Sequence, residues 1–349
     1  MKTLIIGAGA IGCLVGGRLA LAGQQVTLIG RPPVVEAIQA HGLTLSSGVQ
    51  THTAVTVEAV PSLAAALAGG ASFDLAILTV KAYDTATVMA ELAPWRPHLP
   101  PLLTLQNGVG NEERLAGILG AGRVIAGAIT TPVTVTAPGV IEVTRRGRIA
   151  LAAVDPRANA FPLLSLAALF AAAGLPTRVY EDFRALKWTK LLMNQLANAT
   201  CAILGWLPAQ VMADPRLADL EIAAWRETLA VMATQRIRPV TLGGYPFPWL
   251  APLIRTLPPA VIRLALGRLV GGARGGKAPS LYLDLAAGKG RTEVAYLNGA
   301  VAAASAEIGT PVNRVLTETL QALSAGQTPW EQWRDQPARL LQRVQEARR

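Results

Sequence analysis

The chain opens with the stretch Met1-Lys2-Thr3-Leu4-Ile5-Ile6-Gly7-Ala8-Gly9-Ala10-Ile11-Gly12, in which an apolar run meets a glycine-rich turn. A helix-like segment, residues 13–21, follows directly. In such a strand–turn–helix unit the first glycine permits a tight turn, the second lets the backbone approach a pyrophosphate, and the third lets helix and strand pack closely. The helix N-terminus then offers free N–H groups and a partial positive charge to the anion. The stretch therefore predicts a dinucleotide site, and the alternative is a turn that only packs tightly. The expected cofactor-binding residues of this turn are Gly7, Ala8, Gly9, Ala10, Ile11 and Gly12.

A second apolar run, residues 25–29, is the expected second strand. Proteins that prefer NAD usually place Asp or Glu about 20 residues after the glycines, where the carboxylate binds the ribose 2′-hydroxyl. Here that strand is followed by Gly30-Arg31-Pro32-Pro33, and no carboxylate is present to repel a phosphate. Arg31 offers a planar, permanently charged fork for a 2′-phosphate. The sequence therefore favours NADP(H), with a solvated arginine at a strand end as the alternative.

The composition predicts an ordered, globular enzyme. The chain has 349 residues, of which 51% are hydrophobic and 15% charged, so its length indicates two domains with sizeable cores. Cys13 and Cys201 have no metal-ligand spacing and give no disulfide framework. No secretory signal pattern is found, and we expect a cytoplasmic protein. The net charge of +10 comes from scattered arginines without interleaved aromatics. It suits an anionic cofactor and a carboxylate substrate, and nucleic-acid binding is not expected.

Two apolar stretches are candidates for a membrane-spanning helix. Residues 161–175 are too few to cross a bilayer and are expected to form a packed helix. Residues 249–270 are long enough, but three arginines and Pro258-Pro259 interrupt them. An amphipathic helical hairpin is therefore expected there, and no membrane span.

Strand and helix patterns alternate through the first half of the chain. Five further strands are expected at residues 74–80, 102–105, 124–128, 149–154 and 177–180, with helices between several of them. This alternation is typical of an α/β fold with a mostly parallel, doubly wound sheet, and the pattern becomes helical from about residue 182. We expect a dinucleotide-binding domain over residues 1–180 and an all-α domain over residues 181–349. Residues 238–280, which repeat Pro and Gly and include Trp249, resemble an insertion with one or two short helices.

A polar stripe marks the start of the helical half. Lys190, Asn194 and Asn198 stand at i, i+4 and i+8 on the helix expected over residues 186–198, so they share one face. Burying such a stripe is costly unless its groups find partners, and a cleft with a polar ligand provides them. A lysine ammonium can donate a proton and asparagine amides can fix a hydroxyl or carboxylate. The alternative is an ordinary exposed face, and the spacing alone does not decide between the two.

Two strand ends and one later helix start carry further candidates. Lys81 follows the strand at residues 74–80, and Asn107 follows the next one in Leu105-Gln106-Asn107-Gly108. Ligands of doubly wound sheets bind at the carboxyl ends of the strands, where both residues lie. Glu293 opens a helix after the segment that begins at Ser280. The alternative to a functional role is that Glu293 is simply a negative charge that the dipole of this helix favours at its N-terminus.

Six motifs in this order resemble those of the ketopantoate reductases, also called 2-dehydropantoate 2-reductases. The motifs are GAGAIG at the start, Arg31, TVKA around Lys81, LQNG around Asn107, WTKLLMN with Lys190 and Asn194, and TEVAYLNG around Glu293. The resemblance runs from residue 1 to about residue 312. It implies that NADPH gives a hydride to the C2 carbonyl of 2-dehydropantoate, which yields (R)-pantoate, a pantothenate precursor.

The resemblance also implies roles for residues on the substrate side. Lys190 would be the proton donor, and Glu293 would lie near the reacting hydroxyl. The residues that would hold the substrate are Asn107, Asn194, Asn198, Ser280 and Glu293.

On the cofactor side, Arg31 and Lys81 would face the phosphorylated ribose region, Asn107 would lie between nicotinamide and substrate, and the backbone near Val133 would pass the cofactor. The implied architecture is a Rossmann domain followed by a helical domain like that of 6-phosphogluconate dehydrogenases, with the active site in the cleft between them. Closure of the two domains would exclude water.

The chain departs from the family pattern on the substrate side. The run before Glu293, residues 285–291, is one residue longer than usual, and residues 238–280 are enlarged. NADPH is therefore better supported than ketopantoate. The alternatives are a reductase of another small 2-keto acid, an opine-type dehydrogenase on the same scaffold, and a non-catalytic NADP-binding redox sensor. The partner is expected to be a small-molecule 2-keto acid, no metal site is expected, and the oligomeric state stays open, a homodimer being one option.

Overall fold

The computed structural model describes residues 1–47, 51–54, 57–273, 277–304 and 308–349. The chain divides into two compact units, which we describe separately. Unit 1 comprises Met1–Gln106 and Gly110–Lys187, and unit 2 comprises Asn107–Val109 and Trp188–Arg349. The assignment of a dinucleotide-binding role to residues 1–180 and a substrate role to residues 181–349 stays a prediction.

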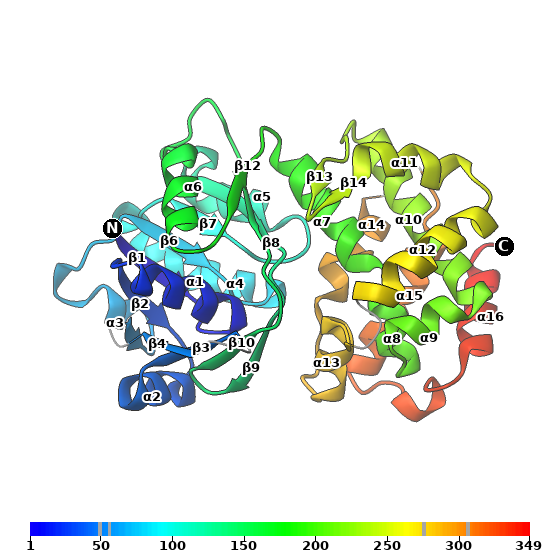
Figure 1. Ribbon diagram of the computed structural model, residues 1–349, viewed down its shortest axis with the longest axis horizontal. Helices are drawn as coiled ribbons and strands as arrows, with labels where there is room; N and C mark the ends of the chain where they lie inside the picture. Colours follow the sequence, from blue (N-terminus) through cyan, green and yellow to red (C-terminus); the bar gives the residue numbers. More distant parts are fainter. Residues whose placement is uncertain (48–50, 55–56, 274–276, 305–307) are drawn as a thin grey trace. The chain divides into compact units, whose positions relative to one another are not determined.

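Unit 1 is built on an eight-stranded sheet with the strand order β12-β11-β8-β7-β6-β1-β2-β5 (Figure 1). All neighbouring strands pair parallel except β8 and β11, which pair antiparallel. The strands are β1 (Lys2–Ile6), β2 (Gln25–Ile29), β5 (Val57–Val60), β6 (Leu75–Leu78), β7 (Leu102–Thr104), β8 (Val124–Ile129), β11 (Ile149–Ala153) and β12 (Thr177–Val179). The five strands predicted after the first two are confirmed as β6, β7, β8, β11 and β12.

The apolar runs of this sheet are buried on both faces, as in a parallel sheet covered by helices. Because successive side chains point to opposite faces, Leu4 and Ile5 belong to different cores. The core that contains Ile5 includes residues of α1 (Ala10–Leu21) and α6 (Leu163–Ala172). The core that contains Leu4 includes residues of α3 (Leu63–Ala66), α4 (Thr85–Leu92) and α5 (Asn111–Leu119). The expected doubly wound sheet is thus confirmed.

A second, four-stranded sheet in unit 1 was not predicted. Its order is β4-β3-β10-β9, formed by β3 (Leu43–Ser46), β4 (Thr51–Ala54), β9 (Val133–Ala137) and β10 (Val140–Val143). It lies against the same helix that follows the glycine-rich turn, since α1 contacts β3, β9 and β10. The first strands of this sheet follow α2 (Pro32–His41).

Unit 2 is helical, apart from the short hairpin of β13 (Thr241–Leu242) and β14 (Tyr245–Pro246) (Figure 1). The helix α7 (Phe183–Gln195) starts in unit 1 and ends in unit 2. The helices that follow are α8 (Asn198–Leu204), α9 (Pro208–Ala213), α10 (Pro215–Thr234), α11 (Phe247–Thr256), α12 (Pro259–Ala273), α13 (Ser280–Ala286), α14 (Asn298–Ala303), α15 (Pro311–Ser324) and α16 (Pro337–Ala347). The expected change to a helical pattern near residue 182 is confirmed.

The apolar stretch at residues 249–270 forms two successive helices, each of which contacts α10, and the packing of the two against each other as a hairpin stays a prediction. It belongs to α11 and α12, and Leu257-Pro258 lie between the two helices. Within the described part of the chain, no helix combines the length and the apolar character that crossing a bilayer demands.

One helix prediction was wrong in its extent. The stretch at residues 186–198 is not a single helix, because α7 ends at Gln195 and Ala197 takes a left-handed conformation with φ of 57°. Asn198 starts the next helix, α8. The spacing i, i+4, i+8 therefore holds on one helix only for Lys190 and Asn194.

Candidate active site

The glycine-rich turn of unit 1 has glycines where the backbone conformation and the close packing require them. Gly7 has a φ of 115°, which side chains rarely adopt. A Cβ at Gly12 would overlap the carbonyl oxygen of Gly7 and lie 2.7 Å from the Thr79 hydroxyl, so only glycine fits where α1 crosses β1. A Cβ at Gly9, in contrast, would meet no atom within 4 Å. The bare backbone of Gly9 thus faces open space beside the N-terminus of α1, as needed for an anion held by backbone N–H groups.

Arg31 lies at the end of β2, beside this turn. It is the N-cap residue of α2 and its side chain is exposed. The preceding residue packs on the turn, because a Cβ at Gly30 would lie 2.8 Å from Cβ of Ala8. No acidic residue stands in the first turn of α1 or of α2. The guanidinium of Arg31 is therefore exposed to solvent beside the glycine-rich turn.

The other two cofactor-side candidates lie at edges of the same unit. Lys81 follows β6 and precedes the 3₁₀ turn at residues 82–84, so it stands at the carboxyl end of the sheet, as expected. Val133 begins β9, is half-buried and packs against the core that contains α1. The segment that carries Val133 thus contacts the helix that starts at the glycine-rich turn.

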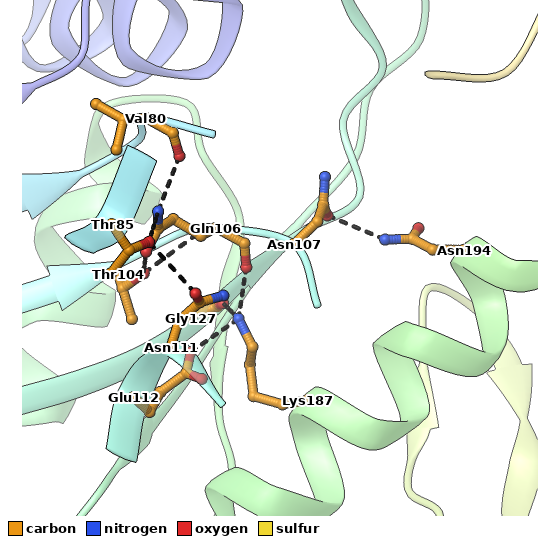
Figure 2. A network of polar contacts seen from close by, with 10 residues as sticks. All are labelled: Val80, Thr85, Thr104, Gln106, Asn107, Asn111, Glu112, Gly127, Lys187 and Asn194. Atoms are coloured by element: carbon orange, nitrogen blue, oxygen red, sulfur yellow. Dashed lines mark hydrogen bonds and ion pairs between the residues drawn. The ribbon is translucent and has the colours of Figure 1, made fainter. Parts of the chain in front are cut away.

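The substrate-side candidates of unit 2 gather around the end of α7. Asn194 donates from Nδ2 to Oδ1 of Asn107 at 3.0 Å (Figure 2). One turn earlier on the same face, the side chain of Lys190 is only 8% exposed. This burial removes the alternative that the stripe is ordinary exposed surface.

Asn198 ties the break between α7 and α8 to the start of α13. Its Nδ2 donates to the carbonyl oxygen of Asn194 at 3.0 Å and lies 3.4 Å from Oγ of Ser280. Its Oδ1 accepts from the backbone N–H of Leu281 at 3.1 Å. Asn198 therefore helps to satisfy the first turn of α13, which begins with the exposed Ser280.

Glu293 lies in the segment that supports Asn107. It opens a four-residue 3₁₀ helix, Glu293–Tyr296, and is 3% exposed. At the other end of this helix the carbonyl oxygen of Tyr296 accepts from N–H of Val109 at 3.2 Å. Gly108, with φ of 84°, leaves no room for a Cβ, which would lie 2.6 Å from Cβ of Tyr296. The glycine after Asn107 is thus what allows this loop to dock on the Glu293 segment.

Of the buried charges that the sequence did not predict, two bear on the candidate site, and Lys187, which pairs with the buried Glu112, is the first. Its Nζ lies 2.8 Å from Oε1 of Glu112 and donates to the carbonyl oxygens of Gln106 at 2.6 Å and Gly127 at 3.2 Å (Figure 2). Both side chains of the ion pair are at most 2% exposed. Burial raises the pKa of the Glu112 carboxyl, and the charge of Lys187 opposes this rise. A lysine in the otherwise apolar stretch Ala185-Leu186-Lys187-Trp188 was the only signal in the sequence.

The second is Glu221 on α10, which fixes the break between α7 and α8. Its carboxylate accepts from N–H of Ala197 at 2.7 Å and from the hydroxyl of Thr200. Burial raises the pKa of Glu221 to about 7, and these two hydrogen bonds oppose the rise. The carboxylate thus holds the left-handed residue that separates Asn194 from Asn198.

Gln106, whose carbonyl binds Lys187, is itself held by buried polar contacts. Its side-chain Nε2 donates to the carbonyl oxygen of Val80 at 3.0 Å and to the Thr85 hydroxyl at 2.8 Å (Figure 2). The chain therefore leaves β7 in a fixed path just before Asn107. In the described part of the chain no group of acidic, histidine or cysteine side chains has a metal-binding arrangement.

Comparison with known proteins identifies relatives of both halves. Residues 3–156 match the family model "Ketopantoate reductase PanE/ApbA", and residues 182–324 match "Ketopantoate reductase PanE/ApbA C terminal". A 2-dehydropantoate 2-reductase of Halobacterium salinarum is 30% identical over 332 residues, which cover 92% of this chain and 98% of that protein. One of Pyrococcus horikoshii is 38% identical over 209 residues, which are 58% of this chain but only 64% of that protein.

Solved structures agree with these matches. The crystal structure of a PanE/ApbA family ketopantoate reductase from Ralstonia eutropha matches with a TM-score of 0.77 and 28% identity. The match covers 94% of this chain and 99% of that one. A D-mandelate dehydrogenase in a ternary structure with NADH and anilino(oxo)acetate has a TM-score of 0.78 at 22% identity, which shows a shared fold. That match covers 93% of this chain and 99% of the other.

Proposed function

The chain belongs to the ketopantoate reductase family, and on this basis we propose that it reduces 2-dehydropantoate to (R)-pantoate with NADPH. It is an oxidoreductase of that family. We assign dinucleotide binding to residues 1–180 and substrate binding to residues 181–349. The observation that carries the proposal is the buried Lys190 one turn from the Asn194–Asn107 pair, because reduction of a carbonyl needs a proton donor and groups that fix the substrate.

The cofactor assignment rests on the turn and on Arg31. The open space at Gly9 and the N-terminus of α1, which no side chain caps, suit the pyrophosphate, while the exposed guanidinium beside the turn suits a 2′-phosphate. When bound, NADPH supplies the hydride. Arg31 and Lys81 are proposed to hold its phosphorylated ribose region, and the backbone near Val133 to pass alongside it.

The proton assignment rests on α7. As hydride reaches the C2 carbon, negative charge develops on the carbonyl oxygen, and the Lys190 ammonium is proposed to donate a proton to it. Asn107, Asn194, Asn198 and Ser280 offer amide and hydroxyl groups to the substrate. Glu293 is proposed to accept a hydrogen bond from the hydroxyl that forms.

The choice of 2-dehydropantoate among 2-keto acids is supported by the curated relatives that carry that activity in their names. A second candidate is a reductase of a different 2-keto acid. It is favoured by the shared fold of the D-mandelate dehydrogenase that binds NADH and anilino(oxo)acetate.

Absorbance at the NADPH band tests the proposal, with 2-dehydropantoate, pyruvate and 2-ketoisovalerate offered in turn. We expect oxidation of NADPH, fastest with 2-dehydropantoate, and slower oxidation of NADH. If no 2-keto acid oxidises either cofactor, the enzyme proposal fails and a redox sensor is favoured. If another acid has a higher kcat/KM, the named substrate is wrong.

A further inference from the structure

An apolar cavity of about 140 Å³, partly open to solvent between the exposed side chains of Leu253 and Val261, lies in unit 2 next to the helix that carries Lys190 and Asn194. One wall is formed by Met193 and Leu196 of the α7 region and by Trp225 of α10. The opposite wall comes from the segment that the sequence marked as enlarged, with residues of the β13–β14 hairpin, α11 and α12. The reductase activity proposed above does not by itself assign a role to this cavity.

The lining of the cavity is almost entirely hydrocarbon. Tyr245 and Phe247 pack with ring centroids 6.1 Å apart, and Phe247 meets Trp225 edge-on at 6.3 Å. The indole N–H of Trp225 is used elsewhere, because it donates to the carbonyl oxygen of Leu192 at 2.8 Å. The ring therefore offers its carbon surface to an occupant. An apolar cavity of about 150 Å³ stays dry and binds benzene, so this one is large enough for a phenyl or isobutyl group.

The cavity is also within reach of the proposed reaction centre. Met193 is three residues after Lys190, and residues at this spacing on a helix have Cβ atoms about 5–6 Å apart. The enlarged segment is attached to α7 one residue before Lys190, because N–H of Val240 donates to the hydroxyl of Thr189 at 3.0 Å. A substrate whose carbonyl lies at Lys190 can thus extend its side chain over Met193 into the apolar space.

We propose that this cavity is the subsite for the substrate's side chain, so that 2-keto acids with branched or aromatic hydrocarbon side chains are substrates of this enzyme. The inference rests on the proposed 2-keto acid reductase activity. Fully burying such a side chain stabilises a complex by about 1.5–3 kcal/mol, which corresponds to a factor of roughly 10–150 in kcat/KM. The three aromatic rings and the near absence of polar groups favour this class over side chains that carry charge.

The test compares kcat/KM, from NADPH oxidation, for pyruvate, 4-methyl-2-oxopentanoate, phenylpyruvate and 2-oxoglutarate. We expect the branched and aromatic acids to exceed pyruvate by at least about 10-fold and 2-oxoglutarate to fall below it. If all four acids are used about equally, the cavity is not the subsite, although the enzyme remains a 2-keto acid reductase. If none is used and 2-dehydropantoate is also inert, the proposed function itself fails and this inference fails with it.

A matched pair of variants on α12 locates the effect. Ala265 lines the cavity, whereas its neighbour Leu264 is 65% exposed and is not among the lining residues. Ala265→Trp should fill the space and lower kcat/KM for phenylpyruvate by roughly 10-fold or more while leaving pyruvate nearly unchanged. Leu264→Trp should change neither. Equal effects of both variants, or equal loss for both acids, would overturn the assignment, and turnover of pyruvate reports that the variant is folded.

Discussion

Replacing Lys187 by methionine is expected to lower the free energy of unfolding by about 3–5 kcal/mol. The ammonium compensates the Glu112 carboxylate at 2.8 Å and satisfies the carbonyl oxygens of Gln106 and Gly127, all in a region sealed from water. Methionine fills much of the same volume, so packing changes little and the cost is mainly electrostatic. Native domains are stable by only about 5–15 kcal/mol, so the loss is a large fraction of the total.

The pH dependence separates this cause from a simple packing defect. In Lys187→Met the buried Glu112 keeps the burial that raises its pKa and loses the cation that opposes the rise. A carboxyl whose pKa is raised in the folded state loses stabilising free energy as the pH rises above its ordinary value near 4.5. The variant should therefore be penalised more at pH 8 than at pH 5. Adding Glu112→Leu should recover at least about 2 kcal/mol, because only the two carbonyl groups then remain without their donor.

Urea unfolding monitored by amide hydrogen exchange is the suitable assay, since peptides from the two units can be followed separately. Glu318→Gln is the control. It breaks exposed ion pairs, with Arg314 at 3.8 Å and Arg343 at 3.7 Å, and should cost at most about 1 kcal/mol. A cost below about 1 kcal/mol for Lys187→Met, or one that does not grow with pH, would refute the electrostatic reasoning.

Four further changes are predicted. Lys190→Ala should lower kcat by roughly 10²–10⁴-fold while the Kd for NADPH, measured by fluorescence titration, changes little; near-normal turnover would remove Lys190 as the proton donor. Arg31→Ala should weaken the binding of NADPH much more than the binding of NADH. An equal loss of affinity for both would mean that Arg31 does not bind a 2′-phosphate. Gly12→Ala should reduce stability and dinucleotide affinity together because its Cβ overlaps the turn. The control Gly117→Ala on α5 meets no atom within 4 Å and should be neutral or slightly stabilising in thermal unfolding. Glu221→Gln should flatten the pH dependence of stability, because the pKa of Glu221 is raised to about 7 from an ordinary 4.5. Between pH 4.5 and 7 the free energy of unfolding of the wild type should fall by about 3 kcal/mol more than that of the variant. If urea unfolding gives the same pH dependence for both proteins, the prediction is contradicted.

The large sheet and the change to helices could be predicted because each depends on local pattern. Continuous apolar runs such as Leu75–Leu78 are typical of strands buried on both faces, and the glycines at the turn have backbone roles that only glycine can fill. The smaller sheet escaped prediction because β9 is largely exposed and has no apolar run. Short, exposed strands are stabilised by partners distant in the chain, and β10 pairs with both β9 and β3.

The buried charges could not be predicted from the sequence for a related reason. Lys187 and Lys190 are both lysines in the same helix, and nothing in the local sequence says that one pairs with a carboxylate 75 residues earlier (187 − 112). In the sequence, Glu221 similarly resembles an ordinary exposed charge on an amphipathic helix. What distinguishes these residues is burial together with a specific partner, and both depend on the tertiary fold.

The break at Ala197 changes how the polar stripe works rather than removing it. On a continuous helix Asn198 would stack one turn beyond Asn194, and its amide would have no link to α13. The left-handed residue lets Asn198 contact the carbonyl oxygen of Asn194 with its Nδ2 while its Oδ1 holds the first turn of α13. The same amide therefore joins the end of α7 to the helix that begins at Ser280. Since Glu221 accepts a hydrogen bond from the backbone N–H of Ala197, the geometry of these proposed substrate ligands depends on a buried carboxylate whose own hydrogen bonds go to Ala197 and Thr200.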